Sequence, residues 1–321
     1  MKSVSIDLGG TTIKLAVVKD GSVLTQSHIP ALSGEGLKER LPDLEKRIRE
    51  MVDLRTIDGM GIAFPGIVDP TGKRILSVNG KYTDAMKMDL DAWCQKTFGL
   101  EMILENDANA ALAGELSYGA GRGYGDAVIM ILGTGVGTAA AMGGHLLRSK
   151  HHQAGCLGGH IAVEVDGRPC TCGSRGCLEA NASTWALPLL AREDPGFAES
   201  GLSRESTIDY LALETWYKRG DPLAIRLFNH SVKCWSTGII NLIHAYDPEL
   251  VILSGGVIKF KELYEPIVRR VRKYAWTPWG EPEFRIAKDP EQSVVLGVHG
   301  LLLQFLRSGM EINKEEMKGD I

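Results

Sequence analysis

The chain has 321 residues, a length that excludes a disulfide-stapled mini-protein and predicts two domains, each able to bury its own core. Hydrophobic residues make up 44% and charged residues 24%, which is typical of a soluble globular protein. With 36 basic and 40 acidic side chains the net charge is only −4, so nothing in the composition indicates nucleic acid or a membrane as a partner.

The N-terminal segment contains no apolar core of the length that a secretory signal needs, so we expect a cytoplasmic protein. The window Ala127–Leu147 has His145 as its only ionisable side chain, which superficially suits a membrane span. Its five glycines and its β-branched residues favour two buried strands joined by a glycine-rich turn instead.

The first part of the chain predicts a sheet covered by a helix. Three short β-rich runs between Ser3 and Ile29 predict an antiparallel meander, whose last two strands are joined at Lys19–Gly21. Apolar residues then recur at helical spacing from Leu37 to Met51, which predicts an amphipathic helix packed on that sheet. A strand is expected near Ile57–Phe64.

A second strand, Glu101–Leu104, runs through Glu105, Asn106 and Asp107 into the alanine-rich helix Ala108–Leu116, so these polar side chains are expected at the carboxyl end of a strand. After the glycine-rich segment 119–123 the pattern of strand, turn and strand begins again. The later expected elements are the strand pair Val128–Met142, the helix Pro222–Tyr246, the strand Leu250–Leu253 and a final helix near Val294–Leu306. This alternation predicts an α/β fold.

Three glycine-rich turns each follow an apolar strand directly. Backbone N–H groups can converge on phosphate oxygens where no Cβ intervenes, and threonine hydroxyls can add donors. For any one of these motifs, a glycine turn that only connects two strands is the more common explanation, but three such turns in one chain favour nucleotide binding. None matches a Walker or a dinucleotide-binding pattern. The residues concerned are Gly9, Gly10, Thr11 and Thr12, then Gly133, Thr134, Gly135 and Gly137, and finally Gly255 and Gly256.

A cysteine cluster is the strongest chemical signal in the sequence. Cys170, Cys172 and Cys177 follow His160 by ten residues or more, and three thiolates with one imidazole can complete a tetrahedral zinc shell. A disulfide is the alternative, but a chain without a secretory signal is expected to keep its thiols reduced. Four protein ligands leave no position for substrate, so the predicted Zn²⁺ is structural and orders a loop.

Several motifs together resemble those of a known family. The pattern Asp7-x-Gly9-Gly10-Thr11-x-x-Lys14, the segment Leu132–Gly137 and the segment Leu253–Val257 resemble the phosphate-1, phosphate-2 and adenosine motifs of actin-like ATPases. The segment Gly159–Glu179 resembles the signature of the ROK branch (repressors, open reading frames and kinases), Gly-His followed by Cys-x-Cys-Gly-x-x-Gly-Cys-x-Glu. This resemblance covers nearly the whole chain and is weakest from Ala191 to Tyr217.

The resemblance implies roles for individual residues. It implies that Asp7 holds Mg²⁺, that Asn106 contacts a sugar and that Asp107 is the base for phosphoryl transfer from ATP. It also implies that His160 and Glu179 contact sugar hydroxyls, His160 while it binds the metal. From the residues alone, the motif at 106–107 is as readily a helix N-cap, Glu179 a solvated carboxylate at a helix start, and Lys14 an exposed surface charge, so we assign no role to Lys14.

One position departs from the family pattern. Many ROK kinases have glutamate three residues before the histidine, where this chain has Leu157. Loss of a charge-assisted acceptor weakens the hold on one hydroxyl by about 1.5–3 kcal/mol, enough to change which sugar is preferred. The identity of the sugar therefore stays open.

The resemblance implies two actin-like (ribonuclease H-like) ATPase domains with a cleft between them and a zinc-binding loop at 160–179. We expect the smaller domain to span 1–113, with the final helix 294–306 folding back on it, and the larger to span 114–293. The expected activity is an ATP-dependent kinase acting on the 6-hydroxyl of a hexose, glucose or a close relative such as mannose first and N-acetylmannosamine next, in a homodimer.

Two alternatives come from other functional classes. ROK members include sugar-responsive transcriptional repressors, which carry a helix-turn-helix module ahead of the kinase-like region. Only six residues precede Asp7 in this sequence, too few for that module, and the net charge of −4 does not indicate a basic surface for DNA. Leu157 motivates the other alternative, a sugar sensor without catalysis.

Overall fold

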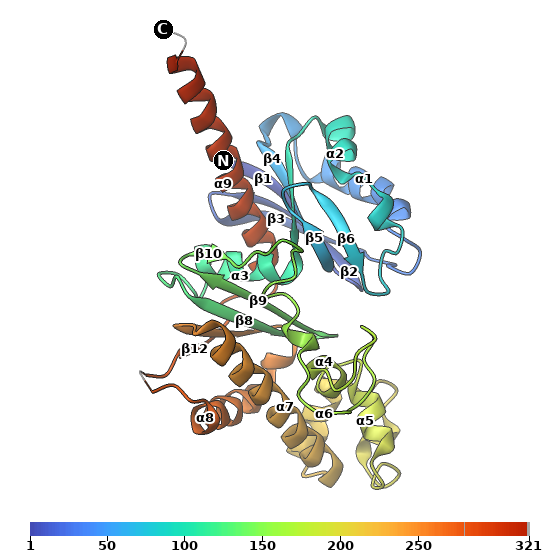
Figure 1. Cartoon of the computed structure of the whole chain (residues 1–321). Coiled ribbons are helices and arrows are strands. Elements are labelled where there is room, and N and C mark those ends of the chain that lie inside the picture. The colour runs from blue at the N-terminus through green and yellow to red at the C-terminus, as the bar shows by residue number, and fades with distance from the viewer. Residues whose placement is uncertain (279, 320–321) are drawn as a thin grey trace. The chain divides into compact units, whose positions relative to one another are not determined.

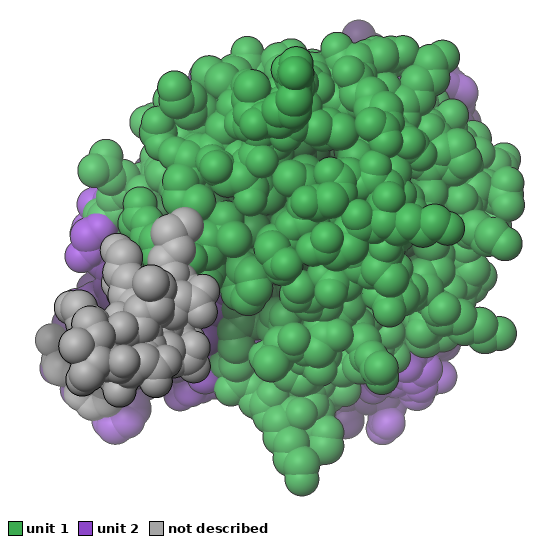
Figure 2. Space-filling view, turned by 90° about the horizontal axis from the view of Figure 1, so that it is seen from above, with its two compact units in different colours: residues 1–122, 148–153, 288–321 green, residues 123–147, 154–287 purple. Residues whose placement is uncertain are grey.

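The computed structural model describes residues 1–278 and 280–319, and the side chains of these residues as far as Ser308. The chain folds into two compact units (Figures 1 and 2). The first unit contains Met1–Arg122, Arg148–Gln153 and Lys288–Ile321, and the second contains Gly123–Leu147 and Ala154–Ala287.

The first unit is built on a five-stranded sheet with the order β3-β2-β1-β4-β7. β1 (Lys2–Leu8), β2 (Thr12–Lys19) and β3 (Ser22–Pro30) form the expected antiparallel meander, and β4 (Gly59–Phe64) and β7 (Met102–Asn106) continue the sheet in parallel with β1 (Figure 1). Parallel neighbours end at the same edge of a sheet, so the carboxyl ends of β1 and β7 lie on one side of the unit.

Alternation along β1 decides what each face of this sheet meets. Val4, Ile6 and Leu8 join one apolar core with residues of α1 (Leu41–Met51) and α2 (Leu90–Phe98). Successive strand residues point to opposite faces, so the odd-numbered positions of β1 point away from this core. Helix α1 follows the expected spacing, whereas α2 was not among the elements expected from the sequence.

The opposite face is covered by α3 (Asp107–Tyr118) and α9 (Ser293–Gly319), whose apolar residues pack on β1, β2, β4 and β7. Ser3 of β1 meets this layer, where its Oγ lies 2.7 Å from Nδ1 of the buried His299. Asp7, four residues further along the same strand, points to the same face. Because α3 is one helix as far as Tyr118, the first stretch of this unit continues past Ala113, and α9 returns the end of the chain to it.

Helices α3 and α9 cross with almost no space between their backbones. A Cβ added at Gly297 of α9 would lie 1.7 Å from the carbonyl oxygen of Ala110, and one added at Gly114 of α3 would lie 1.9 Å from that of Ser293. Only glycine fits at either position, so this pair of residues fixes how deeply α9 is seated against α3.

A small antiparallel pair, β5 (Gly66–Asp69) and β6 (Arg74–Val78), follows β4 and was not expected from the sequence. The chain after β6 is anchored by Tyr82, whose side chain is completely buried beside Phe64. Its hydroxyl donates to the carbonyl oxygen of Gly9 at 2.8 Å, which ties this segment to the turn between β1 and β2.

The second unit repeats the sheet plan of the first, with the order β10-β9-β8-β11-β12. An antiparallel run is again extended on one side by parallel strands. The strands are β8 (Ala127–Leu132), β9 (Val136–Met142), β10 (His145–Leu146), β11 (Leu250–Ser254) and β12 (Glu283–Ile286). The apolar window 127–147 thus forms three strands, and no helix among the described residues is long and apolar enough to cross a membrane.

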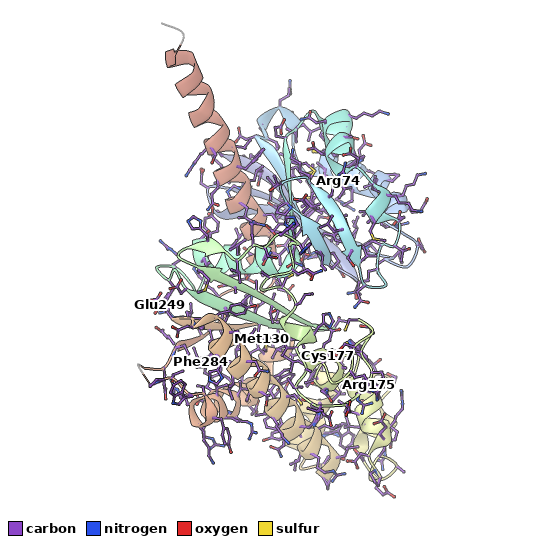
Figure 3. The ribbon with its side chains drawn as sticks, viewed as in Figure 1. Arg74, Met130, Arg175, Cys177, Glu249 and Phe284 are labelled. Carbon is purple, nitrogen blue, oxygen red and sulfur yellow. The ribbon has the colours of Figure 1, made fainter. Side chains whose placement is uncertain are left out.

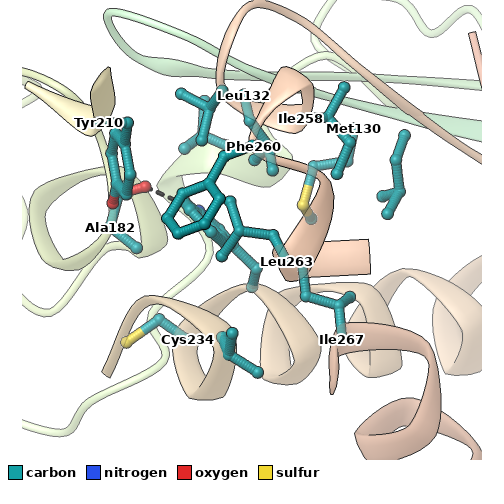
Figure 4. Close-up of a cluster of buried hydrophobic side chains, with 14 of the residues drawn as sticks. Met130, Leu132, Ala182, Tyr210, Cys234, Ile258, Phe260, Leu263 and Ile267 are labelled. Carbon is teal, nitrogen blue, oxygen red and sulfur yellow. Dashed lines mark hydrogen bonds between the residues drawn. The ribbon is translucent and has the colours of Figure 1, made fainter. Parts of the chain in front are cut away.

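The core of this unit gathers around α7, which has the expected bounds, Pro222–Tyr246 (Figure 4). Trp235 of α7 is completely buried, and its indole N–H donates to the carbonyl oxygen of Ala182 at 2.7 Å, so the residue buries its ring without leaving its one donor unpaired. The other helices of the unit are α4 (Leu178–Asn181), α5 (Leu187–Glu193), α6 (Tyr210–Lys218) and α8 (Tyr264–Tyr274).

Candidate functional site

The turn between β1 and β2 is held open and rigid by its neighbours. A Cβ at Gly9 would lie 2.5 Å from the carbonyl oxygen of Thr12, so the turn itself requires glycine there. The carbonyl oxygen of Gly10 accepts a hydrogen bond from the Ser33 hydroxyl at 2.8 Å, and that of Thr11 accepts one from the backbone N–H of Ala31. With these carbonyls bound inside the unit, the turn is pre-organised to present its N–H groups to an anion.

Asp7 precedes this turn and stands among charged groups. Burial raises the pKa of Asp7 to about 7, Lys14 lowers it, and Asp107 and Glu291 raise it further. The Lys14 ammonium lies 3.0 Å from a Glu291 carboxylate oxygen and 3.9 Å from Asp7 Oδ2, so it is an ion-pair partner inside the unit and not a solvated surface charge. A carboxylate whose pKa is raised by burial in spite of a nearby lysine is suited to a divalent cation, which would stabilise its ionised form.

Asp107 is the first residue of α3, directly after β7. The N-cap of this helix is Asn106, whose side-chain oxygen accepts from the N–H groups of Ala108 and Asn109 at 3.0 Å each. The alternative of a capping role at this motif therefore holds for Asn106. Asp107 Oδ1 accepts from the Ala108 N–H and the Asn106 amide.

The electrostatic setting of Asp107 suits a base. Burial raises the pKa of its carboxyl, and the Ala108 N–H and the charge of Lys81 lower it. A carboxylate whose pKa is raised by burial is a stronger base than an ordinary surface aspartate, so it accepts a proton from an alcohol more readily.

Glu105, one residue before the cap, supports the motif from inside the unit. Its carboxylate is almost fully buried and accepts from the Asn106 N–H at 2.9 Å, from the Asn109 amide at 3.1 Å and from the Arg148 guanidinium at 2.6 Å. Arg148 belongs to the short segment Arg148–Gln153 that returns to the first unit. A glutamate within a strand expected to be buried indicates that its carboxylate needs a partner, so the sequence offered a signal for Glu105. No feature of the sequence pointed to Arg148 as that partner.

In the second unit, the turn between β8 and β9 meets Glu179. Glu179 accepts from the Val136 N–H at 2.9 Å and from the Trp185 indole at 3.2 Å. A Cβ at Gly135 would lie 2.3 Å from Glu179 Oε2, so glycine there lets the carboxylate approach. Glu179 lies in the first turn of α4, but its carboxylate is bound to the glycine-rich turn and is not a solvated helix-start group.

The four predicted zinc ligands come together in this unit. The ligand atoms of His160, Cys170, Cys172 and Cys177 all lie within 4.8 Å of one another. Cys172 Sγ and Cys177 Sγ are 3.7 Å apart, and Cys170 Sγ is 3.6 Å from His160 Nδ1. A tetrahedral shell with Zn–S bonds near 2.3 Å has edges of about 3.6–3.8 Å, so both the donors and their spacing fit zinc.

Glycines shape the loop around this cluster (Figure 3, near Arg175 and Cys177). Gly173 and Gly176 both have positive φ, at 89° and 69°, and a Cβ at Gly176 would lie 1.8 Å from the carbonyl oxygen of Glu164. Before the loop, Gly159 packs against β9, where a Cβ would lie 1.9 Å from the carbonyl oxygen of Val136. These close approaches fix the backbone that carries His160.

The third glycine turn follows β11. Gly255 has a φ of 94°, and a Cβ there would lie 2.2 Å from the carbonyl oxygen of Leu132 at the end of β8. Gly256 starts a short 3-10 turn, so the chain reaches α8 only after two such turns. Each unit thus carries strand-end glycine turns, with two carboxylates added in the first unit and the metal cluster in the second.

Comparison with known proteins agrees with these features. The model of the ROK family matches residues 3–304. The chain belongs to the ROK family. It is 32% identical over 281 residues to a glucokinase of Thermotoga maritima, which covers 85% of this chain and 88% of that protein.

Other ROK relatives are enzymes and regulators. A ROK glucokinase of Streptomyces griseus, solved in complex with glucose and AMPPNP, superposes with a TM-score of 0.79 at 27% identity and covers 94% of this chain and 99% of that one. A xylose repressor of Bacillus spizizenii is 25% identical over 262 residues, 80% of this chain and 65% of the repressor. The family match and the superposed structure confirm the expected fold and the similarity to glucokinases. The relatives also include a regulator.

Proposed function

We propose that this chain is an ATP-dependent hexose kinase that phosphorylates the 6-hydroxyl of glucose or a close relative. One observation carries the proposal: Asn106 caps α3 and leaves the adjacent Asp107 directly after β7, where its charge raises the pKa of Asp7 at the end of β1. Two partly buried carboxylates near a rigid glycine turn suit phosphoryl transfer to an alcohol.

In the proposed reaction Asp107 accepts the proton of the sugar hydroxyl. The hydroxyl oxygen forms a bond to the γ-phosphorus of ATP while the bond from that phosphorus to the β-phosphate oxygen breaks, which releases ADP. Asn106 contacts the sugar and holds Asp107 in place through its amide. Asp7 would hold Mg²⁺, which when bound neutralises charge on the phosphates.

Nucleotide binding is assigned to the three glycine turns. In this proposal Gly9, Gly10, Thr11 and Thr12 bind phosphate oxygens in the first unit. The turn containing Gly133, Thr134, Gly135 and Gly137 and the turn containing Gly255 and Gly256 serve the nucleotide in the second unit. The glucokinase solved with AMPPNP supports an ATP site in this fold.

The sugar contacts assigned to the second unit depend on the metal cluster. With Zn²⁺ bound by its four ligands, His160 and Glu179 would be fixed at the two ends of the loop, and both are proposed to contact sugar hydroxyls. The link from Glu179 to Val136 ties this loop to a glycine turn. The zinc would thus be structural and act by positioning the loop.

Glucose is the first candidate substrate, supported by the glucokinase relatives. Leu157 lies directly before the short helical turn 158–160 and offers no acceptor where many ROK kinases have a carboxylate. A changed set of acceptors changes sugar preference, and N-acetylmannosamine is the second candidate.

A coupled assay of ADP release with a panel of hexoses tests the proposal. We expect saturable turnover with glucose or a near relative, and loss of turnover in Asp107→Asn with sugar binding nearly retained. A sugar-responsive regulator or a silent sensor would bind a sugar with no ADP release from any member of the panel. That result, or an Asp107→Asn variant with most of its turnover intact, would remove the assignment.

We further propose a cytoplasmic homodimer, on the basis of the sequence and the family resemblance. Light scattering coupled to size-exclusion chromatography measures the mass in solution directly, and a monomeric mass would contradict the dimer.

A further inference from the structure

Lys81 is a charged residue to which neither the motifs nor the proposed mechanism gives a role. It lies between β6 and the buried Tyr82, in a segment that is firmly fixed. The Tyr82 N–H donates to the Ser33 carbonyl oxygen at 2.8 Å, and its hydroxyl donates to the Gly9 carbonyl oxygen. Tyr82, the residue next to Lys81, is therefore held by its backbone N–H and by its side-chain hydroxyl to the segments around the β1–β2 turn.

The Lys81 side chain lies directly over that turn. A Cβ added at Gly10 would be 2.5 Å from Lys81 Cε and 2.6 Å from its Nζ. The ammonium group thus occupies the space that a larger residue at position 10 would fill. Glycine at position 10 is what allows a cation to rest against the main chain of the proposed phosphate turn.

The same ammonium acts on Asp107, whose pKa it lowers against the larger effect of burial. Lys81 therefore stands near two parts of the proposed reaction, the turn assigned to phosphate and the carboxylate assigned to the sugar proton. A positive charge at that place is suited to the oxygens of a phosphoryl group in transfer.

Lys81 also differs from the nearby lysine on β2. Lys14 is compensated by Glu291 at 3.0 Å and by Asp7 at 3.9 Å. Among the residues whose side chains the structure describes, none forms an ion pair or a hydrogen bond with the partly buried Lys81. A surface lysine would spread into solvent, whereas this one is folded back on the turn with its donors available.

We infer that Lys81 is a further catalytic residue of the proposed kinase, whose ammonium contacts the oxygens of the transferred phosphoryl group above Gly10. The catalytic part of this inference rests on the proposed kinase function, whereas the contact between Lys81 and the γ-phosphate can be tested by binding alone. Bound ATP would bring the γ-phosphate, and ADP, which lacks it, would gain little from Lys81. This difference gives the residue a signature that a structural role does not have.

The test compares Lys81→Met with Lys81→Arg and with the control Lys87→Met, which removes a solvent-exposed lysine six residues further along the chain. Calorimetry measures the affinity of each protein for AMPPNP and for ADP, with Mg²⁺ present, and thermal unfolding checks that each is folded. We expect Lys81→Met to weaken AMPPNP by about tenfold or more and ADP by less than twofold. Lys81→Arg should retain part of the difference, and the control should match the unaltered chain.

Kinetics add a second readout. Lys81→Met is expected to lower kcat by about 10²–10³-fold with KM for the sugar within twofold, the range seen when one charge-stabilising donor is removed. Equal loss of AMPPNP and ADP affinity, an unchanged AMPPNP affinity, or a raised KM for the sugar at unchanged kcat would overturn the inference. If the unaltered chain turns over no sugar, the proposed function fails, while the AMPPNP-to-ADP comparison still decides Lys81. No AMPPNP binding by the unaltered chain would overturn both.

Discussion

The crossing of α3 and α9 gives a sharp test of how the tertiary structure supports the proposed base. In Gly297→Ala the new methyl group would lie 1.7 Å from the carbonyl oxygen of Ala110, 2.6 Å from its carbon and 2.9 Å from the backbone nitrogen of Gly114. All three atoms are backbone of α3, so no side chain can rotate away. Carbon atoms make favourable contacts at about 3.5 Å or more, so α9 must retreat from α3 by roughly 2 Å.

The energetic cost follows from overpacking. Forcing extra atoms into a close-packed interior typically costs about 1–3 kcal/mol, and the better helix propensity of alanine returns at most about 1 kcal/mol. Because the clash is with backbone atoms that no side-chain rotation relieves, the cost lies at the upper end of this range, and we expect Gly297→Ala to be less stable by about 2 kcal/mol and to melt several degrees lower. Because Ala110 is only three residues after Asp107, the start of α3 should shift as well, and an error of about 1 Å at a catalytic group can reduce kcat by about a hundredfold.

A matched control lies on the same helix. A Cβ at Gly300 would be 3.4 Å from Tyr118 Cε2, an ordinary contact. Gly300→Ala should be as stable as the unaltered chain or slightly more stable, with kcat unchanged. Thermal and urea unfolding, together with the coupled kinase assay, measure both variants. If Gly297→Ala melted no lower than Gly300→Ala and kept its kcat, the inferred crossing of α3 and α9 would be refuted.

Three further predictions concern the cysteine cluster, Glu179 and His299. Chelation of Zn²⁺ should lower the melting temperature and expose the loop 160–179 to proteolysis. The reason is that a ligand present at a hundred times its Kd stabilises the folded state by about 2.7 kcal/mol. An unchanged melting temperature after chelation would contradict a structural metal. Glu179→Gln should raise KM for the sugar by about tenfold and leave KM for ATP within twofold, and the reverse pattern would show that this carboxylate only braces the β8–β9 turn. Burial lowers the pKa of His299 to about 4, helped by the N-terminal ammonium and opposed by Asp20. Its stabilising contribution is therefore present above pH 6.5 and is lost as the pH falls toward 4, by roughly 3 kcal/mol, because the unfolded state takes up the proton first. His299→Gln should flatten this pH dependence in urea unfolding, and a curve parallel to that of the unaltered chain would contradict it.

Local sequence was sufficient for much of the architecture. The helical spacing from Leu37 to Met51 predicted α1, and the bounds of α7 were predicted to the residue. The glycines of the window 127–147 predicted strands, although the near absence of ionisable side chains there superficially suited a membrane span. These features are set by short-range periodicity and by the backbone freedom of glycine, which are properties of neighbouring residues. The short pair β5 and β6 was missed because its strands are brief and only half buried.

The sequence by itself determined which groups are available: one histidine and three cysteines at a spacing that predicts a zinc shell, two aspartates at the ends of predicted strands, and three glycine-rich turns. Only the tertiary structure decided how these side chains are used. It gave the capping role to Asn106, brought the Lys81 ammonium onto Gly10, and bound Glu179 to Val136. Such contacts join residues far apart along the chain through sheet order and helix packing, and no local pattern encodes them.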